Sequence, residues 1–220
     1  MKGFEMLAAQ VPAAVANGNY FDIIIKGGWI LIPIALLSLV AIFVIFDRFV
    51  VIHGASKEDS LLIKEVKNYI SDGKSNSALI YCQKNNQPLS QLIGEGIRYM
   101  DYSIEDIREA MEAKSREVLL YLENRMNLLA LVASIAPMLG FLGTIMGVIK
   151  IFYTISITDN LSIGTISDGL YQKMICSAAG LLVGIIAFIG YHLLNNRIDK
   201  IAANMEKTGN EFIFFLKRGK

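Results

Sequence analysis

The stretch that decides the fold is LLALVASIAPMLGFLGTIMGVI, residues 128–149. It carries no charged side chain, and it is as long as the roughly 20 apolar residues that a helix needs to cross a bilayer. Small or hydroxyl-bearing residues on one side of a membrane helix favour close contact with another helix or a polar path. The stretch therefore predicts a membrane helix that faces protein. The residues that interrupt its large apolar side chains are Pro137, Gly140, Gly143, Thr144 and Gly147.

The composition of the whole chain is that of a membrane protein. Its 220 residues are 54% hydrophobic, with a mean hydropathy of +0.46, whereas soluble domains have about 45 to 50% apolar residues. Two further blocks, 27–46 and 174–194, lack Asp, Glu, Lys and Arg. We therefore expect an all-α integral membrane protein with three transmembrane helices, at 27–46, 128–150 and 173–194.

The positive charges predict the orientation of these spans. Of the 21 Lys and Arg residues, 17 lie in 47–127 and 195–220, and positive residues near span ends are retained in the cytoplasm. We expect 47–127 to be a cytoplasmic helical region and 195–220 a cytoplasmic tail, with an external N-terminal segment at 1–26 and an external loop at 151–172. The net charge of +1 gives no indication of nucleic-acid binding.

Local signals divide the cytoplasmic region into helices. Turn residues at 71–73 and 85–88 predict two breaks. Ser103 followed by Asp106 is typical of a capping box that opens a helix. Because no Pro or Gly follows before Pro137, this helix is predicted to continue without interruption to about Phe152. Both the second and the third membrane helix would then extend into the cytoplasm.

Small residues follow helical spacing on two of the spans, so each set shares one helix face. Such faces suit either tight packing between helices or contact with a partner subunit, and the sequence leaves both open. The hydroxyls of Thr144 and Ser177 likewise either bond their own backbone or serve a polar path. The two sets are Pro137, Gly140, Thr144 and Gly147 on the second span, and Ser177, Gly180, Gly184, Ala187 and Tyr191 on the third.

No Asp or Glu lies inside any of the three spans. Intramembrane acids are the usual stations of a proton pathway, so a proton-carrying group would have to come from a partner helix. Ser177 and His192 are 15 residues apart, about 22 Å along a helix, which is too far for a catalytic dyad. We expect no enzyme activity, no metal site and no cofactor.

Two segments resemble the core motifs of the MotA/TolQ/ExbB proton channel family, and the resemblance is closest to ExbB. They are ASIAPMLGFLGTIMGVI at 133–149 and MICSAAGLLVGIIAFIGY at 174–191; FDRF at 46–49 and the segment 78–97 are also similar. The resemblance implies a proton pathway lined by Thr144, Ser177 and Pro137. It also implies that five glycines face neighbouring helices or a partner: Gly140, Gly143, Gly147, Gly180 and Gly184.

The resemblance further implies an assembly in the bacterial inner membrane. A homopentamer would surround an ExbD-like or TolR-like single-span subunit whose intramembrane Asp carries the proton, with the N-terminus in the periplasm and the C-terminus in the cytoplasm. Proton flow would energise TonB-dependent outer-membrane transport through a TonB-like protein. Two positions depart from the family pattern: Gln172 stands where a Glu is common, and Ile186 where a Pro is frequent.

Three alternatives to the ExbB-like function are weighed. The first is a TolQ-like subunit for envelope integrity, and the sequence alone distinguishes it poorly from an ExbB-like subunit. A MotA-like flagellar stator is disfavoured, since that branch has four spans and a larger cytoplasmic region. A non-conducting membrane scaffold, in which the small residues only pack helices, predicts that removal of the hydroxyls affects assembly alone.

Overall fold

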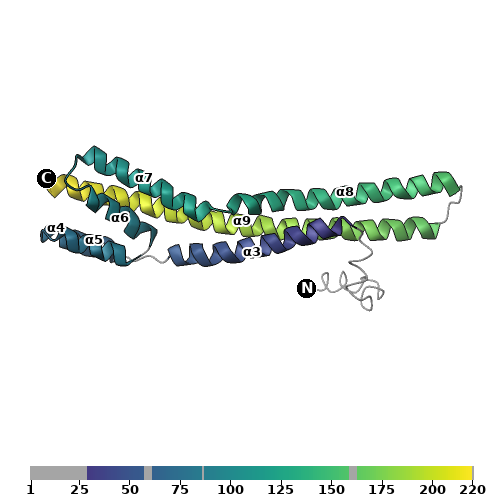
Figure 1. Cartoon of the computed structure of the whole chain (residues 1–220), viewed down its shortest axis with the longest axis horizontal. Helices are drawn as coiled ribbons and strands as arrows, with labels where there is room; N and C mark the ends of the chain where they lie inside the picture. Colours follow the sequence, from purple (N-terminus) through teal and green to yellow (C-terminus); the bar gives the residue numbers. More distant parts are fainter. Residues whose placement is uncertain (1–28, 57–60, 86, 159–162, 220) are drawn as a thin grey trace, which may run out of the picture. The chain divides into compact units, whose positions relative to one another are not determined.

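The computed structural model describes residues 29–56, 61–85, 87–158 and 163–219, and every regular element in these residues is a helix (Figure 1). Three stretches are long and apolar enough to cross a membrane, and they lie in α3, in the segment Ile104–Thr158, and in α9. The prediction of an all-α membrane protein with three spanning helices is confirmed. The helices are α3 (Leu31–Ala55), α4 (Leu62–Ser71), α5 (Ser75–Lys84), α6 (Pro88–Arg98), α7 (Ile104–Glu123), α8 (Met126–Thr158) and α9 (Ile163–Gly219).

The chain divides into two compact units. Among the described residues, the first unit comprises 29–41, 131–158 and 163–187, and the second unit comprises 42–56, 61–85, 87–130 and 188–219. Helices α3, α8 and α9 each contribute to both units. The predicted external segment 1–26 lies outside the described residues, as do residues 159–162 of the predicted external loop.

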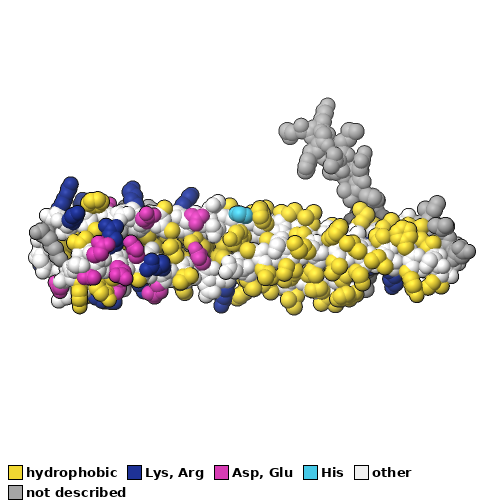
Figure 2. All heavy atoms as spheres, turned by 90° about the horizontal axis from the view of Figure 1, so that it is seen from above, with side chains coloured by type: hydrophobic (Ala, Val, Ile, Leu, Met, Phe, Trp, Pro, Cys, Tyr) yellow, Lys and Arg dark blue, Asp and Glu magenta, His cyan; other side chains and the backbone are white. Residues whose placement is uncertain are grey.

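The surface of the first unit is apolar. Large side chains are exposed on each of its helices, among them Leu36, Phe141 and Leu182, each at least 60% exposed. Figure 2 shows hydrophobic side chains covering the surface of the spans, whereas Lys, Arg, Asp and Glu gather over the helices of the second unit. Soluble proteins do not expose continuous apolar surface of this extent. The chain is therefore a multi-pass membrane protein.

Turn chemistry sets the helix boundaries in the second unit. Helix α4 ends at Ser71, and Gly73 follows with a φ of +73°, a left-handed conformation that glycine adopts without steric cost. Helix α6 begins with Pro88, whose missing N–H costs nothing in the first turn of a helix. Both predicted breaks are confirmed.

Helix α6 packs between α7 and α9 through a glycine. A Cβ at Gly96 would lie 2.7 Å from Sδ of Met111 on α7 and 2.9 Å from Cε1 of Phe212 on α9. Phe212 is completely buried, and Met111 is 3% exposed. An ion pair of 2.5 Å between Lys67 on α4 and Glu211 adds a polar contact to α9. These contacts hold α4, α6 and α7 against the C-terminal part of α9.

The helix that Ser103 opens is shorter than predicted. The capping box is confirmed, since the Ser103 hydroxyl accepts a hydrogen bond from the Asp106 N–H and the Asp106 carboxylate accepts one from the Ser103 N–H, each at 3.1 Å. The expectation of one uninterrupted helix to about Phe152 is wrong. Helix α7 ends before Asn124, and Arg125 has a left-handed φ of +64°.

Contacts with α3 accompany this break. The buried Arg48 side chain donates a hydrogen bond of 3.2 Å from Nη1 to the carbonyl oxygen of Tyr121, one of the last carbonyls of α7, which have no partner inside their own helix. The Asp47 carboxylate accepts from Arg48 at 2.8 Å and from Arg125 at 3.2 Å. Within the FDRF segment, Arg48 therefore caps the end of α7, and Asp47 holds Arg125, the last residue of the turn before α8.

Candidate functional site

Helices α8 and α9 are in backbone contact in the first unit, and glycines make this contact possible. A Cβ at Gly180 would lie 2.5 Å from the carbonyl oxygen of Ala136 and 3.0 Å from Cα of Gly140. A Cβ at Gly140 would lie 3.1 Å from Cα of Ser177. A real Cβ does not come within 2.5 Å of a carbonyl oxygen, and distances of 3.0 to 3.1 Å are tight, so the two helices approach as small residues allow in membranes. We call this contact the α8–α9 seam.

Three further glycines lie on the same seam. A Cβ at Gly143 would lie 2.9 Å from Sγ of Cys176. A side chain at Gly147 would overlap Lys173, and one at Gly184 would overlap the ring of Pro137. All five glycines singled out in the sequence thus meet the opposite helix of the same chain. The structure brings the two predicted faces together.

Thr144 joins the two helices by a hydrogen bond. Its hydroxyl, which is half-buried, is 3.2 Å from the carbonyl oxygen of Gly140 and 3.3 Å from that of Lys173. A hydroxyl has one proton to donate, so the two carbonyls share it, and its oxygen keeps lone pairs that can accept a proton donor. The Thr144 hydroxyl therefore bonds the backbone of its own helix, and it also remains a polar group at the seam. The two interpretations of this hydroxyl from the sequence do not exclude each other.

Pro137 places a carbonyl without a helical partner at the same seam. Its ring removes the hydrogen bond that the carbonyl of Ala133 would otherwise receive. A Cβ at Gly184 would lie 3.1 Å from that carbonyl oxygen. A glycine on α9 therefore leaves room beside the carbonyl. Pro137 itself is half-buried. The Ala133 carbonyl and the Thr144 hydroxyl are thus two polar groups on α8, about three helical turns apart.

Ser177 and Gln172 complete the predicted set on α9. Ser177 is half-buried, and its backbone touches α8 at Gly140. The side chain of Gln172 lies outside the described residues. The lining of a proton pathway by Thr144, Ser177 and Pro137 remains a prediction.

Sequence reasoning missed the role of Cys176. This residue is completely buried and packs with Ile30 and Ile34 of the first span, next to Leu139 and Val183. Cysteine behaves as a small hydrophobe and is among the most frequently buried residues. That tendency is the signal from which the core position of Cys176 could have been predicted. The first span thus packs onto the seam through an apolar cluster.

The comparisons with known proteins place the chain in a family. The sequence model of the MotA/TolQ/ExbB proton channel family matches residues 84–207, more than half of the chain and including the whole α8–α9 seam. The chain belongs to the MotA/TolQ/ExbB proton channel family. The resemblance read from the two motifs is thereby confirmed.

Relatives with two different names are similar to this family member. The Tol-Pal system protein TolQ of Haemophilus influenzae is 25% identical over 221 residues, 92% of this chain and 96% of the relative. The biopolymer transport protein exbB1 of Vibrio cholerae is 37% identical over 86 residues, 39% of this chain and 38% of the relative. The biopolymer transport protein ExbB of Neisseria meningitidis is 24% identical over 190 residues, 80% of this chain and 85% of the relative.

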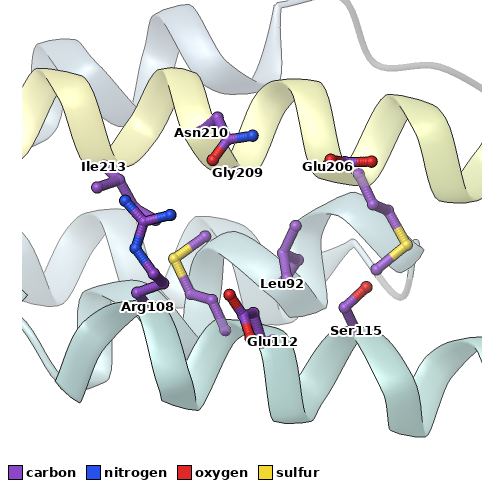
Figure 3. A pocket seen from close by; sticks show the side chains of 10 residues that line it. Leu92, Arg108, Glu112, Ser115, Glu206, Gly209, Asn210 and Ile213 are labelled. Atoms are coloured by element: carbon purple, nitrogen blue, oxygen red, sulfur yellow. The ribbon is translucent and has the colours of Figure 1, made fainter. Parts of the chain in front are cut away.

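Membership of a proton channel family also means that the chain is not an enzyme. The second unit holds a cavity of about 240 Å³. Figure 3 shows Arg108, Glu112 and Ser115 of α7 opposite residues of α9, with Leu92 of α6 between them. This lining mixes charged side chains with apolar ones, and Glu112 also lies 4.0 Å from Arg116. Within the described residues, no three His, Cys, Asp or Glu side chains are grouped to hold a metal ion.

Proposed function

We propose that this chain is an ExbB-like channel subunit that converts the proton motive force into work on TonB-dependent outer-membrane transport. Its partner would be an ExbD-like subunit with one span and an intramembrane Asp, and its own copies would form a ring, a pentamer by the resemblance. The ring would lie in the bacterial inner membrane with the N-terminus in the periplasm and the C-terminus in the cytoplasm.

The observation that carries this proposal is the Thr144 hydroxyl at the α8–α9 seam of a proton channel family member. Its two acceptor carbonyls belong to different helices, at 3.2 and 3.3 Å, so the hydroxyl is held in a fixed position. A held hydroxyl can accept a hydrogen bond from a protonated carboxyl and stabilise the carboxylate after proton loss. Because the three spans contain no Asp or Glu, the titrating group has to be supplied by another chain.

Proton uptake by vesicles that contain this chain and its single-span partner tests the proposal. Replacing both hydroxyls, Thr144→Val with Ser177→Val, should reduce uptake at least about tenfold, because a relay loses its polar groups. The matched variant Thr144→Ser with Ser177→Thr keeps both hydroxyls and should conduct. If the Val double variant assembles and conducts as well as the unchanged protein, the lining role is wrong. A non-conducting scaffold predicts that only the oligomer mass changes.

A TolQ-like function in envelope integrity is the second candidate. The observation that favours it is the similarity to the Haemophilus influenzae TolQ, which extends over 92% of this chain. Expression in a bacterium that lacks both its own ExbB-type and TolQ-type subunits, together with this chain's own partner, separates the two functions. Restored TonB-dependent uptake supports the ExbB-like function, whereas restored detergent resistance alone supports the TolQ-like one.

A further inference from the structure

One cavity of the first unit combines aromatic rings, lysines and apolar side chains. Its volume is about 470 Å³. It lies beside the start of α3, with α8 and α9 contributing the remaining wall. The residues that supply its chemistry are Trp29, Ile30, Met146, Lys150, Tyr153 and Lys173.

Two lysines bring positive charge to this cavity. Within the part of the chain that the structure describes, neither ammonium group forms an ion pair with a carboxylate. The hydrocarbon part of Lys173 lies over Gly147, where any side chain would overlap it. Glycine at position 147 thus gives the Lys173 side chain a path along α8 toward the cavity. Two positive charges beside a partly apolar cavity attract an anion.

The sequence positions put this cavity at the membrane interface. Trp29 stands two residues before α3, Lys150 follows the apolar stretch 128–149, and Lys173 precedes the apolar block 174–194. Trp and Tyr are enriched where spans meet the headgroups, and lysines near span ends extend their ammonium groups to that level. Three ends of spans therefore meet at one depth.

We propose that this cavity binds the phosphate-bearing headgroup of an anionic phospholipid. Lys150 and Lys173 would face the phosphate, and the Trp29 and Tyr153 rings would lie at the level of the glycerol, where their N–H and O–H groups find polar partners. Ile30 and Met146 would contact the first carbons of the acyl chains. Charge complementarity favours this occupant over a neutral lipid, because each lysine at an anionic interface contributes attraction. The proposal requires only that the chain spans a membrane, and it does not depend on the proton pathway.

The single tryptophan makes the test direct. Trp29 is the only Trp of the chain, and it lines the cavity, so its fluorescence reports the lipid beside it. The full-length protein is reconstituted in phosphatidylcholine vesicles that contain either brominated phosphatidylglycerol or brominated phosphatidylcholine at equal mole fraction. The affinity derived from Trp29 quenching should be roughly fivefold or more higher for brominated phosphatidylglycerol than for brominated phosphatidylcholine, since each lysine near an anionic surface adds attraction.

Paired variants separate charge at this cavity from charge in general. The selectivity is the ratio of the affinity for phosphatidylglycerol to that for phosphatidylcholine. The double variant Lys150→Gln with Lys173→Gln should bring this ratio close to one, and Lys150→Arg with Lys173→Arg should keep it at the level of the unchanged protein. Lys207→Gln with Lys217→Gln removes two exposed charges from α9 in the second unit and should change nothing. Equal quenching by both lipids in the unchanged protein overturns the proposal, as expected if residues 1–28 of this chain fill the cavity. Selectivity that persists in the Lys150→Gln, Lys173→Gln variant overturns it as well.

Discussion

Gly180 on α9 and Ala136 on α8 are so close that a Cβ at Gly180 would lie 2.5 Å from the carbonyl oxygen of Ala136. The neighbour on that side is backbone, which cannot move aside as a flexible side chain can. Between apolar helices in lipid, association depends on van der Waals packing and polar contacts. The separation of α8 and α9 is therefore set by the absence of a side chain at position 180.

Gly180→Ala is expected to destabilise the protein by about 1 to 3 kcal/mol, because an added methyl group forces the helix backbones apart. The free energy of unfolding in mixed micelles measures this loss. Gly54→Ala is the matched control, since a Cβ at Gly54 meets nothing within 4 Å. That control should be neutral or slightly stabilising, because Ala is the better helix former. Equal stability of the two variants would contradict the backbone contact.

Arg48→Met should loosen the junction between α7 and α8. The substitution leaves the Tyr121 carbonyl without the 3.2 Å hydrogen bond and Asp47 with one cationic partner fewer. Hydrogen bonds to charged groups contribute about 1.5 to 3 kcal/mol, so we expect a loss of that order. Limited trypsin digestion should also cleave faster after Arg125, because the turn that follows α7 is held less firmly.

The control for Arg48 is Arg116→Met on the exposed face of α7. Arg116 lies 4.0 Å from Glu112, and both side chains are more than half exposed. Exposed ion pairs within a helix contribute only about 0.3 to 0.5 kcal/mol. If Arg116→Met lowers the free energy of unfolding as much as Arg48→Met does, the capping contact of Arg48 contributes no more than an exposed ion pair.

The thiol of Cys82 should react slowly with maleimide. Burial raises its pKa from 9.0 to about 11, because desolvation disfavours the charged thiolate, which is the reactive form. At pH 8 the thiolate fraction falls about 100-fold relative to a thiol with a pKa of 9. The labelling rate, measured by mass spectrometry in a Cys176→Ala background, should rise about tenfold per pH unit up to pH 11.

An exposed cysteine on α7 provides the comparison for Cys82. Ala113→Cys in a protein with Cys82→Ala and Cys176→Ala places a thiol at an exposed position, and its labelling rate should level off near pH 9. If Cys82 labels as fast as this thiol at pH 8, the buried position of Cys82 in the second unit is wrong.

Local signals in the sequence were sufficient for the three spans and for the helix ends at the two breaks and at the capping box. Gly73, Pro88 and the Ser103–Asp106 capping box each act through the backbone within a few residues of their own position. A 22-residue apolar stretch likewise specifies a span without reference to the rest of the chain. These features were therefore predicted correctly.

Two features required knowledge of residues distant in the sequence. Helical spacing put the glycines of α8 on one face, but spacing does not identify the neighbour, which is α9 of the same chain. The break at Arg125 involves Asp47, 78 positions earlier, and Arg48 caps a carbonyl 73 positions later. No Pro or Gly marks that break, so helix-forming tendency alone predicted an uninterrupted helix.

Helix α9 is continuous for 57 residues through both units, whereas the path from α7 to α8 is interrupted at Asn124 and Arg125. Each residue of an α-helix turns the chain by about 100°. One residue inserted in the middle of α9 would therefore rotate every following side chain by that angle and move Met205 and Phe212 off the buried face. Insertions and deletions among relatives are thus expected between α7 and α8, where the helical phase is already broken. The length of α9 should be constant among them.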